Sequence, residues 1–182
     1  MTTRMIFAGF GGQGVMLMGQ IMSLAGMIQG KNVTWMPSYG PEMRGGTANC
    51  TVVISDEPVA SPVTNKAEVI VAMNIPSMTK FEPCVESGGF LFLNQSVIDR
   101  KPNRTDINIV KVPCNEIADE LGNLKVANMV MLGGVIGATN VVDTESIFKA
   151  LEKKLSGGKS ALIEINKQAI LRGIEIAKNA SK

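Results

Sequence analysis

The chain has 182 residues, 45% of them hydrophobic and 19% charged, which is typical of a globular protein with one substantial core. A net charge of +2 and an aromatic content of 4% argue against nucleic acid as a partner. Its three cysteines are scattered and histidine is absent, so neither a disulfide framework nor an internal metal site is expected. The apolar stretch 129–138 is shorter than the roughly 20 residues of a membrane span, and no signal-peptide pattern opens the chain, so we expect a cytoplasmic protein without membrane contact.

Strands, glycine turns and helices alternate along the first half of the chain. This order predicts a three-layer α/β/α, Rossmann-like fold with a mostly parallel sheet and helices on both faces. The first strand is expected at Thr3–Ala8 and the first helix at Gln13–Gln29, which Gly30 ends. The later strands are expected at Asn32–Met36, Cys50–Ser55, Ala67–Met73, Gly89–Leu93 and Ile107–Val112.

Helical patterns dominate the chain from Asn115 onward. Asn115 is the expected N-cap of a helix at Glu116–Leu121. The helix expected at Asn128–Thr139 is apolar nearly all round, which predicts that it is buried or packs against another chain. A helix at Thr144–Leu155 precedes one at Ser160–Ala180, whose charged face indicates an outer position. Since no long linker divides the chain, residues 1–182 are predicted to form a single domain.

Residues 9–14 read Gly-Phe-Gly-Gly-Gln-Gly and connect the first predicted strand to the first predicted helix. Such a turn directs backbone N–H groups and a helix N-terminus at an anion. A phosphate-bearing ligand is therefore the first candidate, although a tight turn that binds nothing fits the motif equally well. The candidate contacts are Gly11, Gly12, Gln13 and Gly14, with the Gln13 amide at the mouth of the site.

Two common nucleotide sites do not fit this turn. A nicotinamide dinucleotide site would place an acidic residue at the end of the second strand, where residues 35–38 read Trp-Met-Pro-Ser. A P-loop would continue with Gly-Lys-Ser/Thr, which is absent here. A free-standing nucleotide-binding enzyme is thus disfavoured.

A second unusual segment, 38–49, reads Ser-Tyr-Gly-Pro-Glu-Met-Arg-Gly-Gly-Thr-Ala-Asn and is expected within a long loop from Pro37 to Asn49. Loops that follow the first two strands of such a fold lie at one edge of the sheet, so Arg44 is expected to approach an anion held at residues 11–14. The alternative is a surface ion pair between Arg44 and Glu42, which would contribute little.

Together these two motifs resemble the gamma subunit of 2-oxoacid:ferredoxin oxidoreductases, and among them the 2-oxoglutarate type most closely. The apolar strand at 67–73 and the Asn-Met-Val-Met-Leu-Gly start of a helix at 128–133 agree with this resemblance. It covers essentially the whole chain and implies one pyruvate/ketoisovalerate oxidoreductase gamma-type domain over residues 1–182.

The resemblance implies a role in an enzyme that oxidatively decarboxylates a 2-oxoacid, joins the acyl group to coenzyme A and passes two electrons to ferredoxin. Thiamine diphosphate, magnesium and iron–sulfur clusters would belong to alpha, beta and delta (ferredoxin-type) partners. This chain would be a non-catalytic subunit that binds no cofactor or metal alone, contacts coenzyme A and helps to close the active site. The expected reaction converts 2-oxoglutarate to succinyl-CoA. The alternative is a purely structural subunit of a pyruvate or branched-chain 2-oxoacid oxidoreductase.

Carried over residue by residue, the resemblance brings the turn at 11–14 close to the phosphates of coenzyme A. Related single-chain enzymes have consecutive lysines in the second loop, where this chain has Glu42 and Met43. Arg44 would then supply the positive charge, with Gly45 and Gly46 beside it. Cys50 matches no catalytic role and is expected to be a buried strand residue.

Overall fold

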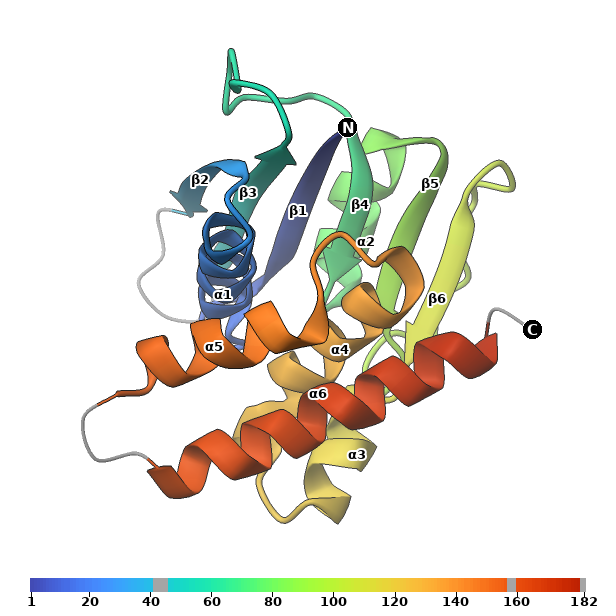
Figure 1. The fold of residues 1–182 in the computed structure, drawn as a ribbon. Coiled ribbons are helices and arrows are strands. Elements are labelled where there is room, and N and C mark those ends of the chain that lie inside the picture. The colour runs from blue at the N-terminus through green and yellow to red at the C-terminus, as the bar shows by residue number, and fades with distance from the viewer. Residues whose placement is uncertain (41–45, 157–159, 181–182) are drawn as a thin grey trace.

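The computed structural model describes residues 1–40, 46–156 and 160–180 (Figure 1). A six-stranded sheet has the order β2-β3-β1-β4-β5-β6, in which β3 alone runs antiparallel to its neighbours. The strands are β1 (Thr2–Phe10), β2 (Asn32–Tyr39), β3 (Thr47–Ser55), β4 (Ala67–Ala72), β5 (Val85–Asn94) and β6 (Asn108–Val112). The helices are α1 (Val15–Ile28), α2 (Ile75–Phe81), α3 (Cys114–Glu120), α4 (Ala127–Thr139), α5 (Thr144–Lys154) and α6 (Ser160–Ala180), with short 3-10 turns η1 (Glu82–Cys84) and η2 (Leu124–Val126).

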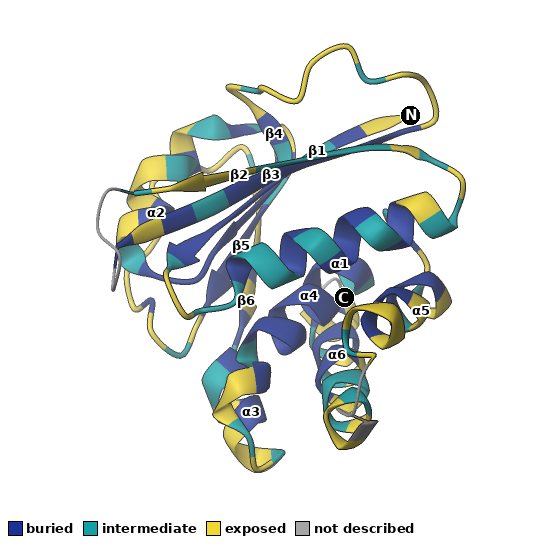
Figure 2. Ribbon diagram, turned by 90° about the vertical axis from the view of Figure 1, so that its left-hand side faces the viewer, coloured by how far each residue is buried: buried dark blue, intermediate teal, exposed yellow. Residues whose placement is uncertain are grey.

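Helices cover both faces of the sheet, but unequally (Figure 2). On one face α1 and α4 lie against the strands, while α5 packs outside α1 and α6 outside α4. On the other face the short helix α2 covers a smaller core built on β1, β4 and β5. The predicted three-layer α/β/α architecture with a mostly parallel sheet is confirmed, and so is the outer position of the last helix.

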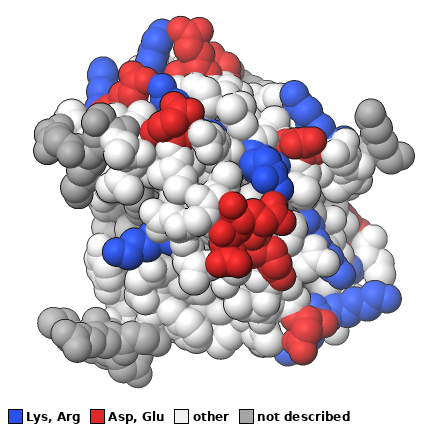
Figure 3. Space-filling view, turned by 90° about the horizontal axis from the view of Figure 1, so that it is seen from below, with Lys and Arg blue, Asp and Glu red and all other residues white. Residues whose placement is uncertain are grey.

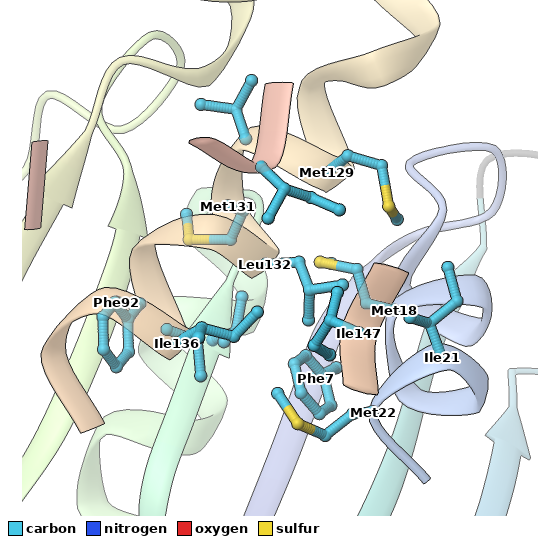
Figure 4. Packing of buried hydrophobic residues seen from close by; sticks show 14 of the residues in the cluster. Phe7, Met18, Ile21, Met22, Phe92, Met129, Met131, Leu132, Ile136 and Ile147 are labelled. Carbon is cyan, nitrogen blue, oxygen red and sulfur yellow. The ribbon is translucent and has the colours of Figure 1, made fainter. Parts of the chain in front are cut away.

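The larger core is rich in methionine (Figure 4). Phe7 from β1, Met18 and Met22 from α1, Leu132 from α4 and Ile147 from α5 point toward one another between the sheet and the outer helices. Methionine fits such a junction of several elements because its unbranched side chain adapts to irregular gaps.

Helix α4 is enclosed by the chain itself, between the sheet and α6. Glycines allow the two helices to approach closely. A Cβ atom built on Gly133 would lie 2.0 Å from the backbone oxygen of Ile170, and one on Gly173 would lie 1.9 Å from that of Val130. The apolar character of α4 on all sides therefore reflects burial within this chain.

Several predicted boundaries are wrong by a few residues, for local reasons. Strand β2 continues through Pro37 to Tyr39, because β2 lies at the edge of the sheet and a proline there need not break a ladder. Much of the long loop expected from Pro37 to Asn49 is therefore hairpin strand, since β3 already begins at Thr47. Helix α3 begins at Cys114, one residue before Asn115, so Asn115 is not its N-cap.

Candidate functional site

The glycine turn between β1 and α1 adopts the conformation that its sequence predicts. Gly12 and Gly14 have φ angles of 93° and 76°, in the left-handed region that favours glycine. Gly14 is the N-cap of α1, and no described side chain caps the helix there. The space beside the α-carbon of Gly14 is occupied, because a Cβ atom built there would lie 2.3 Å from Nδ2 of Asn128. Gly12 is open, with no described atom within 4 Å of such a Cβ.

The first turn of α1 offers unpaired hydrogen-bond donors. Met18 donates the first helical bond, to the carbonyl of Gly14 at 3.1 Å. The N–H groups of Val15, Met16 and Leu17 have no acceptor among the described residues, and neither do those of Gly12 and Gly14. Donors at a helix N-terminus together with the helix dipole favour a negatively charged ligand.

Gln13 holds the turn in place. Its Oε1 accepts hydrogen bonds from the backbone N–H of Phe10 at 2.7 Å and from Nδ2 of Asn74 at 2.9 Å. Its Nε2 donates to the carbonyl of Met73 at 3.0 Å. The side chain thus connects the turn to the end of β4. The sequence predicts this amide at the mouth of the site, whereas both of its polar atoms bond within the protein. Its partner Asn74, which also caps α2 through Oδ1, could not be identified from the sequence.

The second loop meets the glycine turn at the edge where the sequence predicts it. The N–H of Gly11 donates to the carbonyl of Gly46 at 2.9 Å, and the N–H of Gly40 donates to that of Thr47 at 2.7 Å. The expected proximity of the two motifs is therefore confirmed for Gly46. Arg44 and Gly45 lie outside the described residues.

A pocket of about 470 Å³ opens between the turn and the second loop. We call it the glycine-turn pocket. Its lining combines the backbone of the turn, the first turn of α1 and the ends of β2 and β3. The described lining residues carry no formal charge and are Phe10, Gly11, Gly12, Gly14, Val15, Met16, Leu17, Gln20, Tyr39, Gly40, Gly46, Thr47 and Ala48. Among the described residues, attraction of an anion therefore depends on the backbone N–H groups.

The surrounding surface is not strongly basic. Figure 3 views the molecule from below, the side on which α3 lies in Figure 1, and shows acidic side chains gathered near the middle of that face. Helix α3 carries the exposed acids Glu116, Asp119 and Glu120. No described helix is both long enough and apolar enough to span a membrane.

The described cysteines near the core do not provide a nucleophile. Cys50 is fully buried in β3, as expected, and its Sγ lies 3.5 Å from the carbonyl of Val15. Burial raises the pKa of the Cys50 thiol to about 12, and burial also raises the pKa of Cys114. Both thiols therefore stay protonated at neutral pH.

Comparison with known proteins gives relatives along nearly the whole chain. A family model described as pyruvate ferredoxin/flavodoxin oxidoreductase matches residues 4–176. The ketoisovalerate oxidoreductase subunit VorA of Methanothermobacter marburgensis is 39% identical over 177 residues, which are 96% of this chain and 36% of that protein. The 2-oxoglutarate synthase subunit KorC of Methanocaldococcus jannaschii is 36% identical over 175 residues, 94% of this chain and 91% of that protein. The chain thus spans about a third of the VorA relative's length.

Solved structures share this fold. The gamma subunit of a keto/oxoacid ferredoxin oxidoreductase from Geobacter sulfurreducens is 29% identical with a TM-score of 0.83, and the match covers 96% of this chain and 98% of that one. The 2-oxoglutarate:ferredoxin oxidoreductase of Magnetococcus marinus is 21% identical with a TM-score of 0.89. That match covers 98% of this chain and 31% of the other chain, and at this identity it supports the fold alone. The resemblance to gamma subunits is thereby confirmed, and the chain belongs to the pyruvate ferredoxin/flavodoxin oxidoreductase family.

Proposed function

We propose that this chain is the gamma subunit of a cytoplasmic 2-oxoacid:ferredoxin oxidoreductase and that its glycine-turn pocket holds the phosphates of coenzyme A. The observation that carries the proposal is a set of backbone N–H groups without described acceptors, beside a pocket of about 470 Å³. They belong to Gly12, Gly14, Val15, Met16 and Leu17. The Magnetococcus marinus enzyme, which shares this fold, has 2-oxoglutarate, coenzyme A and succinyl-CoA bound in its structure. Coenzyme A is proposed here because the chain belongs to the same family of oxidoreductases.

Coenzyme A suits such a site because its nucleotide half is a polyanion. Backbone N–H groups and the α1 dipole can orient its phosphates without a proton transfer. The thiol would then be presented to an active site built by alpha and beta subunits, with thiamine diphosphate supplying the decarboxylation chemistry when bound there. Delta subunits would carry iron–sulfur clusters. A domain closed over that site would also exclude water. In this account the chain positions a substrate and is not itself catalytic.

The 2-oxoacid is proposed to be 2-oxoglutarate, on the strength of the 38–49 motif and the KorC relative. A branched-chain 2-oxoacid is the second candidate, favoured by the VorA relative. Co-purification with the alpha, beta and delta partners, followed by assays with 2-oxoglutarate, 2-oxoisovalerate and pyruvate, tests the proposal. We expect a stable complex that reduces ferredoxin fastest with 2-oxoglutarate. Failure to associate with a thiamine-binding subunit would contradict the gamma-subunit role.

Replacing the predicted cation of the second loop should weaken coenzyme A binding. We expect Arg44→Ala to raise the apparent KM for coenzyme A by roughly 10- to 100-fold in the assembled enzyme, because a hydrogen bond to a charged group contributes about 1.5–3 kcal/mol. The turnover number should change little. Arg100→Ala removes an exposed arginine that contacts Thr79 and serves as the matched control. If the apparent KM for coenzyme A is the same in the Arg44→Ala enzyme as in the control, Arg44 does not belong to the site.

A further inference from the structure

A smaller pocket of about 160 Å³ lies across Gly12 from the glycine-turn pocket. It opens where β4 and β5 end and where α3 and α4 begin. We call it the carboxamide pocket, because amide side chains dominate its polar lining. Those residues are Gln13, Asn94, Asn115 and Asn128, with Lys125 at the same pocket. Gly12 lines both pockets, and a Cβ built on it meets no described atom within 4 Å, so the two pockets adjoin at a residue without a side chain.

Asn115 presents an unused donor. Oδ1 of Asn94 accepts from the backbone N–H of Ser96 at 3.3 Å, which orients that amide. Nδ2 of Asn94 then donates to Oδ1 of Asn115 at 3.1 Å. Asn94 is 1% exposed, so this arrangement is fixed within the protein. Nδ2 of Asn115 is left without an acceptor among the described residues.

Asn128 presents an unused acceptor. Its side chain is well buried, with a relative exposure of 5%. Nδ2 donates to the carbonyl of Gly14 at 3.3 Å, and a carbonyl partner can be satisfied only by the NH₂ end of the amide. Oδ1 of Asn128 therefore remains available, and no described group donates to it. Oδ1 of Asn128 is not among the fully enclosed side-chain atoms that lack a partner, so a donor in the pocket can reach it.

One free donor and one free acceptor match a secondary amide, whose C=O accepts and whose N–H donates. A phosphate or carboxylate could use Asn115 and the exposed Lys125, which has no described ion-pair partner, but it would leave Oδ1 of Asn128 facing a negative charge. The carboxylate of Glu116, next to Asn115 and hydrogen-bonded to Ser96, also disfavours an anion.

We propose that the carboxamide pocket binds an amide group of the pantetheine arm of coenzyme A, which passes over Gly12 from phosphates held in the glycine-turn pocket. This inference rests on the proposed function and deepens it. Phosphates and arm would then occupy adjoining pockets on the two sides of one glycine. Asn115 and Asn128 would determine where the arm, and hence the thiol, leaves the subunit.

The test compares two ligands in the assembled complex, coenzyme A and its nucleotide half, 3′-phospho-ADP. Asn115→Asp keeps Oδ1 for Asn94 but removes the free donor, and a negative charge at the start of α3 is compatible with that helix. We expect this variant to raise the dissociation constant of coenzyme A roughly tenfold and to leave that of 3′-phospho-ADP unchanged. Asn179→Asp, an exposed position on α6, is the control and should change neither.

Other outcomes distinguish the amide assignment of the carboxamide pocket from the phosphate role of the glycine-turn pocket. Unchanged coenzyme A binding in Asn115→Asp, or equal weakening of both ligands, would overturn the amide assignment. A Lys125→Gln variant that weakens 3′-phospho-ADP would instead assign the carboxamide pocket to a phosphate and would also overturn it. If the unmodified complex does not bind 3′-phospho-ADP at all, the phosphate role of the glycine-turn pocket fails, whatever the Asn115 variant shows.

Discussion

Gly133→Ala is expected to lower the free energy of unfolding by roughly 3 kcal/mol, the upper part of the range for overpacking a core. The added methyl group would lie 2.0 Å from the backbone oxygen of Ile170, which cannot rotate away as a side chain could. Helices α4 and α6 would have to separate. The packing energy lost in this way exceeds the stabilisation of about 1 kcal/mol that alanine brings to a helix interior relative to glycine.

Gly134→Ala provides a matched control in the same helix. Its Cβ would meet a methyl group of Val112 at 3.0 Å and no described backbone atom within 4 Å. We expect its stability to stay within about 1 kcal/mol of the unmodified protein, since the helix propensity of alanine offsets a small shift of Val112. Urea unfolding followed by circular dichroism measures both. Equal stabilities for the two variants would contradict the close α4–α6 contact.

Gly12→Ala is expected to raise the apparent KM for coenzyme A by at least about tenfold in the assembled enzyme, which corresponds to about 1.4 kcal/mol of binding. The substitution has room for its methyl group, but it strains a backbone with a φ angle of 93° and adds a methyl group where the two pockets adjoin. Displaced N–H groups in the turn would fit the phosphates poorly.

Gly30→Ala is the control that distinguishes the effect of backbone strain from an effect on coenzyme A binding. Gly30 has a φ angle of 73° and equally open surroundings, but it follows α1 at the other end of that helix. Both variants should lose about 1–2 kcal/mol of stability through left-handed strain. Only Gly12→Ala should change coenzyme A kinetics. Identical kinetics in the two assembled variants would favour a purely structural glycine turn.

Much of this site could be predicted because its determinants are local in sequence. Glycines at 11–14 can form one turn after an apolar strand, and parallel strands bring their carboxyl ends to one edge. These two facts bring the second loop to the edge that holds the turn, whereas the contact of Gly46 with Gly11 continues the antiparallel pairing of β1 with β3. The family resemblance then suggested coenzyme A as the proposed ligand, a choice that the turn alone left open.

The rest of the site depends on contacts between residues that are far apart in the chain. Gln13 bonds to Asn74, 61 residues away, and Asn128 bonds to Gly14 from 114 residues away. No periodicity reveals such pairs, so the carboxamide pocket could not be found from the sequence. Pro37 was misinterpreted for a related reason, since the edge position of β2 that tolerates it follows from strand order.

Amide hydrogen exchange of the assembled complex, with and without saturating coenzyme A, tests the central claim most directly. The N–H groups of Gly12, Gly14, Val15, Met16 and Leu17 have no described acceptor, so bound phosphates should slow their exchange. Peptides from the start of α5, whose N-cap Asp143 already accepts from Ser146, should be unaffected. Slower exchange confined to the glycine turn and the first turn of α1 is the predicted result. Unchanged exchange there at saturating coenzyme A would contradict the proposed role of the glycine turn.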